Sequence, residues 1–250
     1  KYSEDSLGEE IKKAVITVPA NFDGNQREAT LKAGEIAGLN VLRIINEPTA
    51  AALAYCMENT DKDKFVKVMV YDLGGGTFDV TIGDFNNGVL EVLGGSGDNE
   101  LGGKDFDRLI YNFMCEEFLK EYGIDLKEDE MLVHKIMKAA EKAKKSLSTR
   151  KNVDVAIPFL TAKDGKPLGI DTLLTRELFE GLISEKLDGT RKAIKKALKN
   201  AKLKKEDIDM VLLVGGSTRI PMVKELVIDE MGQEPKFDID PDRAVATGAA

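Results

Sequence analysis

Residues 72–79, with the sequence DLGGGTFD, constrain the fold of this chain more than any other stretch. Apolar residues alternate with other residues in 66–70 before it and in 80–82 after it. This period of two predicts two β-strands joined as a hairpin with glycines at its tip. Three glycines exceed what a hairpin turn needs, and they let backbone N–H groups come close to a bulky anion.

Two carboxylates, Asp72 and Asp79, bracket these glycines. Both would repel a polyphosphate unless a divalent cation lay between the carboxylates and the phosphates. The pattern therefore predicts a metal–phosphate site. The alternative is an ordinary hairpin with polar ends, and so short a glycine motif does not decide between the two.

Length and charge exclude several classes of protein. With 250 residues the chain can form one large domain or two smaller ones. Its net charge of -8 argues against nucleic acid or an anionic membrane as partner, and no apolar run approaches the roughly 20 residues that span a bilayer. The single His134 and the separated Cys56 and Cys115 match no metal, redox or triad pattern.

The first sixty residues predict two strand–helix units. Short strands buried on both faces are expected at 14–18 and 41–45. Asp23 and Gln26 resemble a capping box for a helix that runs to Gly38. Pro48 suits the first position of the next helix, so Glu47 is expected to be extended at a strand end, where α/β sheets bind ligands. The alternative role for Glu47 is to complement the helix dipole.

The middle of the chain predicts three strands at 66–72, 78–84 and 89–93, with a turn at 86–88 and a glycine-rich loop at 94–103. Helices are expected at 104–122 and 128–149. In the second helix Glu141, Lys144, Lys145 and Ser148 share one face, which could hold a polyhydroxyl ligand. A solvated Glu–Lys pair is the alternative.

The last third predicts a hairpin of 153–159 with 168–174, and then a long helix capped by Thr175. A buried strand at 210–214 leads at once into Gly-Gly-Ser and a helix. That order can hold phosphate or sugar against backbone N–H groups, and Arg219 could lie flat on an aromatic base. A tight strand-to-helix turn without a ligand is the alternative.

Four segments resemble motifs of the seventy-kilodalton heat-shock chaperones (DnaK-like), in their nucleotide-binding domain: 14–20 (AVITVPA), 45–51 (INEPTAA), 72–79 and 213–221 (LVGGSTRIP). The resemblance covers the chain in order. It implies an α/β fold of the actin-like ATPase (ribonuclease H-like) class, with two lobes flanking a nucleotide cleft. Residues 1–60 would be the later part of lobe I and 61–250 most of lobe II, with a helical/β subdomain at about 100–180.

The resemblance also implies roles for individual residues. Asp72, Asp79 and Glu47 would hold Mg²⁺, mostly through water, and together with Thr77 would serve hydrolysis of ATP to ADP. The glycine hairpin would contact the β- and γ-phosphates. The polar face at 141–148 would contact the adenosine. The turn at 215–219 would contact the α-phosphate side and the base. The implied nucleotide-binding residues are Gly74, Gly75, Gly76, Thr77, Glu141, Lys144, Lys145, Ser148, Gly215, Gly216, Ser217, Thr218, Arg219 and Asp242.

Some features depart from the family pattern. Asn21 stands where the family usually has Tyr, beside Pro19 and Arg27, which match positions that relay the nucleotide state. A second phosphate hairpin and a catalytic lysine would precede residue 1, and a linker and peptide-binding domain would follow residue 250. The chain by itself is therefore expected to be catalytically incomplete.

The function implied is slow ATP hydrolysis coupled to the binding of unfolded peptides. The implied partners are those peptides, a J-domain co-chaperone and a nucleotide-exchange factor, with no nucleic acid and no membrane. The expected location is the cytoplasm, or an organellar lumen where a signal has been removed. An actin-like filament protein and a sugar kinase of the same superfamily are the alternatives.

Overall fold

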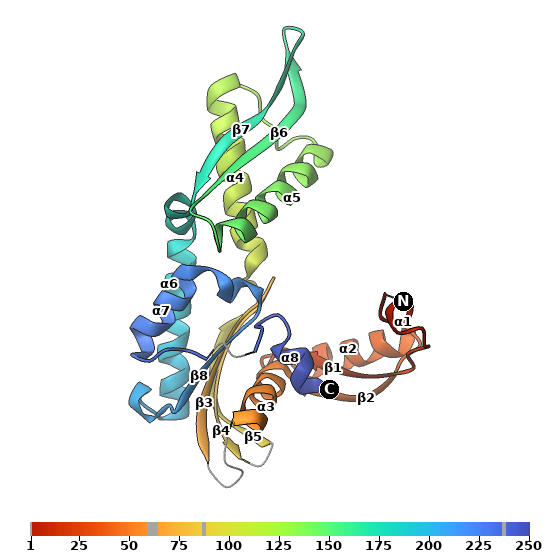
Figure 1. Ribbon diagram of the computed structural model, residues 1–250, viewed down its shortest axis with the longest axis vertical. Helices are drawn as coiled ribbons and strands as arrows, with labels where there is room; N and C mark the ends of the chain where they lie inside the picture. The colour runs from red at the N-terminus through yellow and green to blue at the C-terminus, as the bar shows by residue number, and fades with distance from the viewer. Residues whose placement is uncertain (1, 60–64, 87–88, 237–238) are drawn as a thin grey trace.

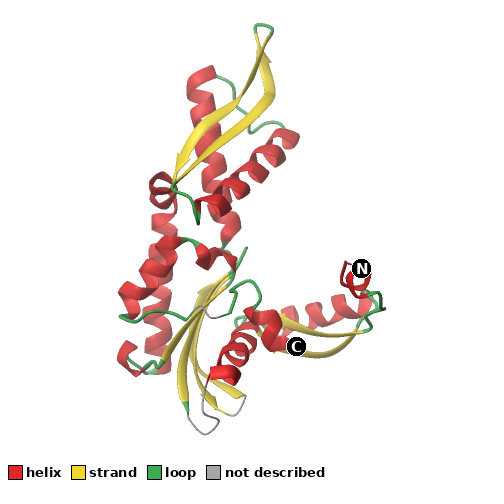
Figure 2. Ribbon diagram, viewed as in Figure 1, coloured by secondary structure: helices red, strands yellow, loops and turns green. Residues whose placement is uncertain are grey.

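The computed structural model describes residues 2–59, 65–86, 89–236 and 239–250 (Figures 1 and 2). The elements in chain order are α1 (Tyr2–Leu7), β1 (Lys13–Val18), α2 (Gly24–Ile36), β2 (Asn40–Asn46), α3 (Glu47–Asn59), β3 (Val66–Leu73), β4 (Phe78–Asn86), β5 (Val89–Asp98), α4 (Gly103–Tyr122), α5 (Glu130–Leu147), β6 (Asn152–Lys163), β7 (Lys166–Thr175), α6 (Arg176–Ala201), η1 (Lys205–Asp207), β8 (Met210–Val214), η2 (Gly216–Arg219), α7 (Pro221–Met231) and α8 (Ala244–Ala249).

The centre of the fold is a four-stranded sheet in the order β5-β4-β3-β8. The predicted glycine hairpin is confirmed: β3 and β4 pair antiparallel, with Asp72 opposite Asp79 and Leu73 opposite Phe78. β8 joins the other edge of β3 in parallel. The carboxyl ends of β3 and β8 therefore lie side by side, which brings the glycine hairpin next to the turn that follows Val214.

Helices cover both faces of this sheet. Side chains of α6 and α7 pack on one face, in a core that continues through α4 and α5 into the β6–β7 hairpin. α3 and α8 cover the other face, where Ala51 and Tyr55 meet Val68 and Val70. Because it lies between these layers, β3 is almost wholly buried, although its sequence alternates like a strand with one exposed face.

The prediction that the first two strands are buried on both faces is wrong. β1 and β2 pair in parallel as a separate two-stranded sheet, and Val15 and Leu42 remain 37% and 58% exposed. α2 packs on one face so closely that a Cβ at Gly34 would lie 2.6 Å from Val41. Within the described part of the chain, the other face has no comparable cover, so apolar composition overstates burial here.

The glycine-rich loop predicted at 94–103 is also only partly correct. β5 runs on to Asp98, with Gly94 paired to Ile82 and Gly97 to Asp79. A Cβ at Gly94 would lie 2.5 Å from the Ala201 backbone, so this glycine allows α6 to approach the strand. The predicted turn at 86–88 lies largely outside the described residues. So does most of 59–64, where charged and helix-breaking residues predict a connection.

An elongated helical and β subdomain stands above the sheet in Figure 1, made of α4, α5, β6 and β7. The predicted β6–β7 hairpin is confirmed, and its turn residues Asp164 and Gly165 both have positive φ, at 52° and 75°. Thr175 caps α6 as predicted, because its hydroxyl accepts the Leu178 N–H. No helix in the described part of the chain is long and apolar enough to cross a membrane.

Candidate functional site

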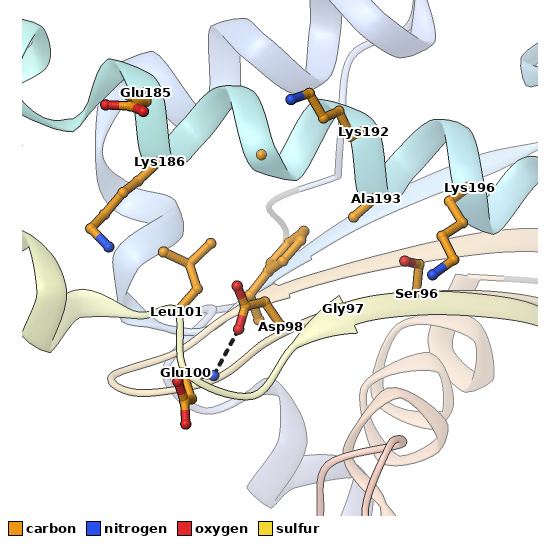
Figure 3. Close-up of a pocket in the computed structure, with 12 residues that line it drawn as sticks. Ser96, Gly97, Asp98, Glu100, Leu101, Glu185, Lys186, Lys192, Ala193 and Lys196 are labelled. Carbon is orange, nitrogen blue, oxygen red and sulfur yellow. Dashed lines mark hydrogen bonds between the residues drawn. The ribbon is translucent and has the colours of Figure 1, made fainter.

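Among the described residues, two cavities lie near the glycine hairpin. One of about 550 Å³ lies between the end of β5 and α6, with Leu101 and Ala193 among its lining residues (Figure 3), and it contains none of the predicted site residues. The other, of about 1050 Å³, lies between the hairpin, α4, α5 and the turn after β8. We call it the central cavity. Predicted residues that line it are Gly75, Glu141, Lys144, Lys145, Ser148, Gly216, Ser217, Arg219 and Asp242.

The glycine hairpin is held through its carbonyl groups. Gly74 O accepts hydrogen bonds from Gly103 N–H and from Ser217 Oγ, each at 2.9 Å, and Gly75 O accepts one from Lys104 N–H. The amides of Gly75 and Gly76 donate no hydrogen bond to any described residue. These two N–H groups therefore remain available to an anionic ligand.

Three carboxylates gather beside the hairpin. Burial, together with the charges of Glu47 and Asp79, raises the pKa of Asp72 to about 7. Burial and the Glu47 charge raise the pKa of Asp79 to about 7, against a lowering hydrogen bond from the Ala20 backbone. Burial also raises the pKa of Glu47. The negative charges of these carboxylates repel one another, and a cation that binds among them reduces this repulsion.

The structure corrects the predicted backbone of Glu47. Glu47 is the first residue of α3 and does not extend β2. The steric effect of Pro48 on the preceding residue is a preference, and the packing of α3 on the sheet outweighs it here. The Glu47 charge still acts on the two aspartates, because it raises the pKa of both.

Asn21 contacts the same carboxylate cluster. Its side-chain amide donates a hydrogen bond to Asp79 Oδ1. A Cβ at Gly97 would lie 2.5 Å from Asp79 Oδ1, so the glycine provides room for this contact. Arg27 fixes the loop that carries Asn21, because its guanidinium donates to the carbonyls of Ala20 and Phe22. The loop after β1 is thereby attached to β4.

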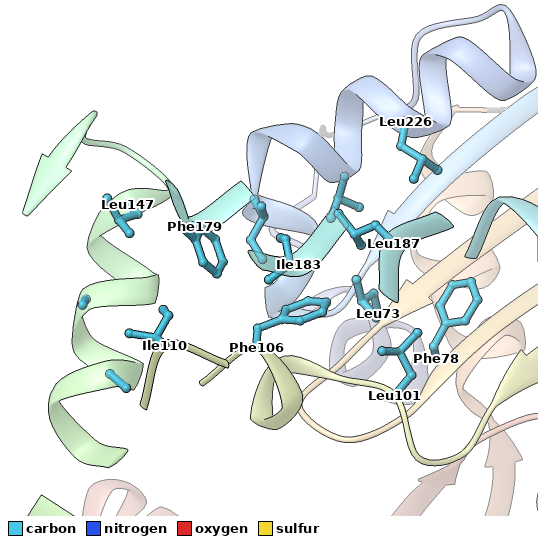
Figure 4. Packing of buried hydrophobic residues seen from close by; sticks show 14 of the residues in the cluster. Leu73, Phe78, Leu101, Phe106, Ile110, Leu147, Phe179, Ile183, Leu187 and Leu226 are labelled. Carbon is cyan, nitrogen blue, oxygen red and sulfur yellow. The ribbon is translucent and has the colours of Figure 1, made fainter. Parts of the chain in front are cut away.

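The predicted polar face is present at the end of α5, where Glu141, Lys144, Lys145 and the C-cap Ser148 all line the central cavity. Glu141 pairs with Lys145 at 2.6 Å. The solvated Glu–Lys pair that the sequence left as an alternative is therefore present, formed by Glu141 with Lys145. Lys144 is instead buried and lies 2.9 Å from Asp107 Oδ1 on α4. Phe106 and Ile110 of α4 belong to the same apolar core as Leu147 of α5 (Figure 4), and this packing sets the spacing of α4 and α5.

The turn after β8 is built on glycines. Gly215 has φ +85°, and a Cβ there would lie 2.5 Å from Leu73 O. A Cβ at Gly216 would lie 2.7 Å from Asp242 Oδ1. The Arg219 guanidinium pairs with Asp242 at 3.0 Å and also with Asp240, and such in-plane pairing leaves the flat faces of the guanidinium free for stacking.

Several predicted residues do not line the central cavity. Gly74, Gly76 and Thr77 form the hairpin beside it, and Gly215 and Thr218 form the turn, where the Thr218 hydroxyl donates to Gly215 O at 2.6 Å. Conversely, sequence reasoning missed Gly103, Lys104, Asp107, Thr149, Ile220, Asp240 and Pro241, all of which line the cavity. Asp107 is a single acidic residue in an amphipathic helix, and no neighbouring residue indicates that it lies at a binding site. The repeated glycines at 102–103 were the one available hint.

Comparison with known proteins gives one consistent family. A family model described as Hsp70 protein matches residues 1–250. A protein named Chaperone protein DnaK from Thermosipho melanesiensis is 52% identical over 250 residues, which cover all of this chain and 42% of that protein. The protein of the same name from Thermotoga neapolitana is also 52% identical, over 100% of this chain and 42% of its own length. The chain thus spans less than half of the relatives that it matches.

Proposed function

The chain belongs to the Hsp70 protein family, and from this premise we propose that it binds ATP and, in the whole protein, hydrolyses it slowly to ADP and phosphate. The observation that carries the proposal is the central cavity. It brings Gly75, the α5 face and the turn after β8 together around one space of about 1050 Å³. A nucleotide has the extended shape and the mixed polarity that these three walls require.

The polar groups suggest how the nucleotide lies. The free amides of Gly75 and Gly76 suit the terminal phosphates, because they offer donors at a place without side chains. At the opposite wall Glu141, Lys144 and Ser148 suit the adenosine, and the flat face of Arg219 suits the base. Gly216 and Ser217 lie between these ends and suit the α-phosphate side.

Magnesium fits the three carboxylates beside the hairpin. Among the described residues no group of three or more potential ligands is close enough to hold a metal directly. Mg²⁺ commonly keeps several of its waters, so Asp72, Asp79 and Glu47 would hold it mostly through water. When bound, the ion supplies charge neutralisation for the phosphates. Asp79, held by Asn21 and the Ala20 backbone, would orient the attacking water, with Thr77 beside it.

The division into lobes and the wider role are part of the same proposal. We assign residues 1–60 to lobe I and 61–250 to lobe II, with the subdomain at about 100–180 forming the nucleoside wall. In the whole protein, hydrolysis would change the affinity for unfolded peptides, with a J-domain co-chaperone and a nucleotide-exchange factor as partners in the cytoplasm. The 52% identity to proteins named Chaperone protein DnaK supports this role.

The proposal is tested in the full-length protein by separating binding from hydrolysis. Asp79→Ala should lower the single-turnover hydrolysis rate by about a hundredfold or more, while Mg-ATP affinity by calorimetry changes less than about tenfold. Glu91→Ala, which removes an exposed carboxylate from the neighbouring β5, should change neither quantity. Equal losses of affinity and rate in Asp79→Ala would contradict a water-positioning role, and absence of ATP binding would contradict the function itself.

A further inference from the structure

The ammonium group of Lys144 is held on two sides by the protein. It donates a hydrogen bond of 2.8 Å to Gly103 O and lies 2.9 Å from Asp107 Oδ1. A lysine ammonium carries three N–H donors, so the hydrogen bond to Gly103 O and the ion pair with Asp107 leave at least one donor for a ligand. Because Lys144 also lines the central cavity, that donor is available at the adenosine wall.

Asp107 acts on Lys144 and cannot reach a ligand through the same oxygen. Its Oδ1 is enclosed by protein, and no described residue gives it a well-directed hydrogen bond, so the nearby ammonium is what compensates its charge. The two side chains are only 10% and 11% exposed. Burial raises the pKa of Asp107, and the Lys144 ammonium lowers it. A buried carboxylate kept beside a buried ammonium fixes the position of both.

The ion pair also decides which ligand group suits this wall. An unpaired ammonium in a cavity would favour a phosphate, whereas a neutralised one offers a directed donor with little net charge. Glu141 and Lys145, which also line the cavity, form an ion pair with each other. A neutral hydroxyl group therefore suits this place better than an anion.

We propose that Asp107 is a positioning residue that holds the Lys144 ammonium in place. A remaining N–H of Lys144 then donates a hydrogen bond to a sugar hydroxyl of the nucleotide. The inference rests on the proposed function and adds the residue that sets selectivity for the sugar. Gly103 belongs to the same arrangement, because a Cβ there would lie 2.9 Å from Lys144 Nζ and 2.8 Å from Ser217 Oγ. A larger residue at 103 would displace the ammonium from the position that Asp107 gives it.

The test crosses protein variants with nucleotides that lack one hydroxyl. Affinities of the full-length protein for ATP, 2′-deoxy-ATP and 3′-deoxy-ATP are measured by calorimetry. The unsubstituted protein should bind one of the two deoxynucleotides about tenfold more weakly than ATP, the cost of one charge-assisted hydrogen bond. In Asp107→Asn this ratio should fall to about twofold or less, because the ammonium is no longer held in place.

Two further variants make the result decisive. Glu116→Gln removes an exposed carboxylate from the same helix α4 and should keep the tenfold ratio. Gly103→Ala leaves the Asp107 carboxylate in place but should lower the affinity ratio between ATP and the deoxynucleotide by displacing Lys144. If circular dichroism shows that Asp107→Asn is unfolded, Gly103→Ala provides the test instead. ATP binding with an unchanged ratio in these variants would overturn this inference alone. Absence of ATP binding to the unsubstituted protein would overturn the proposed function as well.

Discussion

Asp72 and Asp79 face each other across β3 and β4, so their protonation should affect the stability of the chain. Each has a pKa of about 7 in the folded state, above the ordinary value of 3.8, so the folded chain binds more protons than the unfolded chain. This contribution to stability is complete below about pH 4 and is lost as the pH rises through 7. It amounts to at most about 4 kcal/mol per group.

We therefore expect the free energy of unfolding in metal-free buffer to fall between pH 4.5 and pH 8. Urea unfolding measures it, and Asp72→Asn should flatten the pH dependence because one titrating carboxyl is removed. Adding Mg²⁺ at pH 8 should recover part of the lost stability, since a cation replaces the protons. A variant with the same pH slope as the unsubstituted chain would show that these carboxyls titrate normally.

Gly215 should be intolerant of any side chain. Its φ of +85° disfavours other residues, and a Cβ would meet Leu73 O at 2.5 Å, so Gly215→Ala should lower the free energy of unfolding by about 1–3 kcal/mol. Gly181→Ala in α6 is the matched control, because nothing lies within 4 Å of its Cβ position. The control should be stabilised by about 0.5–1 kcal/mol. Equal effects of the two substitutions would refute the steric explanation.

At the scale of one element, the start of α6 depends on the Thr175 hydroxyl. It accepts the Leu178 N–H at 3.1 Å, and the helix then supplies Phe179 and Ile183 to the core. Thr175→Ala should cost about 1 kcal/mol of unfolding free energy, whereas Thr175→Ser should keep most of it because the cap oxygen remains. Chemical denaturation of both variants distinguishes the lost cap from lost packing of the Thr methyl group.

Elements with a strong local pattern could be predicted from the sequence, and contacts between elements could not. The glycine hairpin, the capped start of α6 and the strand before Gly215 each follow from neighbouring residues. The extension of β5 through Gly94 depends on the approach of Ala201, over a hundred residues away in the sequence. Likewise Lys144 reads as a solvent-exposed lysine until the packing of α4 against α5 brings Asp107 to it.

At the scale of the whole molecule, α3 connects the two-stranded sheet to the four-stranded one. It follows β2 directly, carries Glu47 toward Asp72, and packs its alanines under β3. α8 lies against it so closely that a Cβ at Gly248 would overlap the Ala50 carbonyl. The position of Glu47 relative to the two aspartates therefore depends on a helix from the other end of the chain.

Replacing Gly248 should loosen this connection without unfolding the central sheet. In Gly248→Val, α8 must move away from α3, so hydrogen exchange should quicken in α8, α3 and β1. The strands β3 and β4 should stay protected, because the face of the sheet that α6 and α7 cover is unchanged. Ala246→Val, an exposed position of the same short helix, should leave the exchange of α3 and β1 unchanged. Uniformly faster exchange in Gly248→Val would mean that the two sheets open as one cooperative unit, with α3 as an inseparable part of a single core.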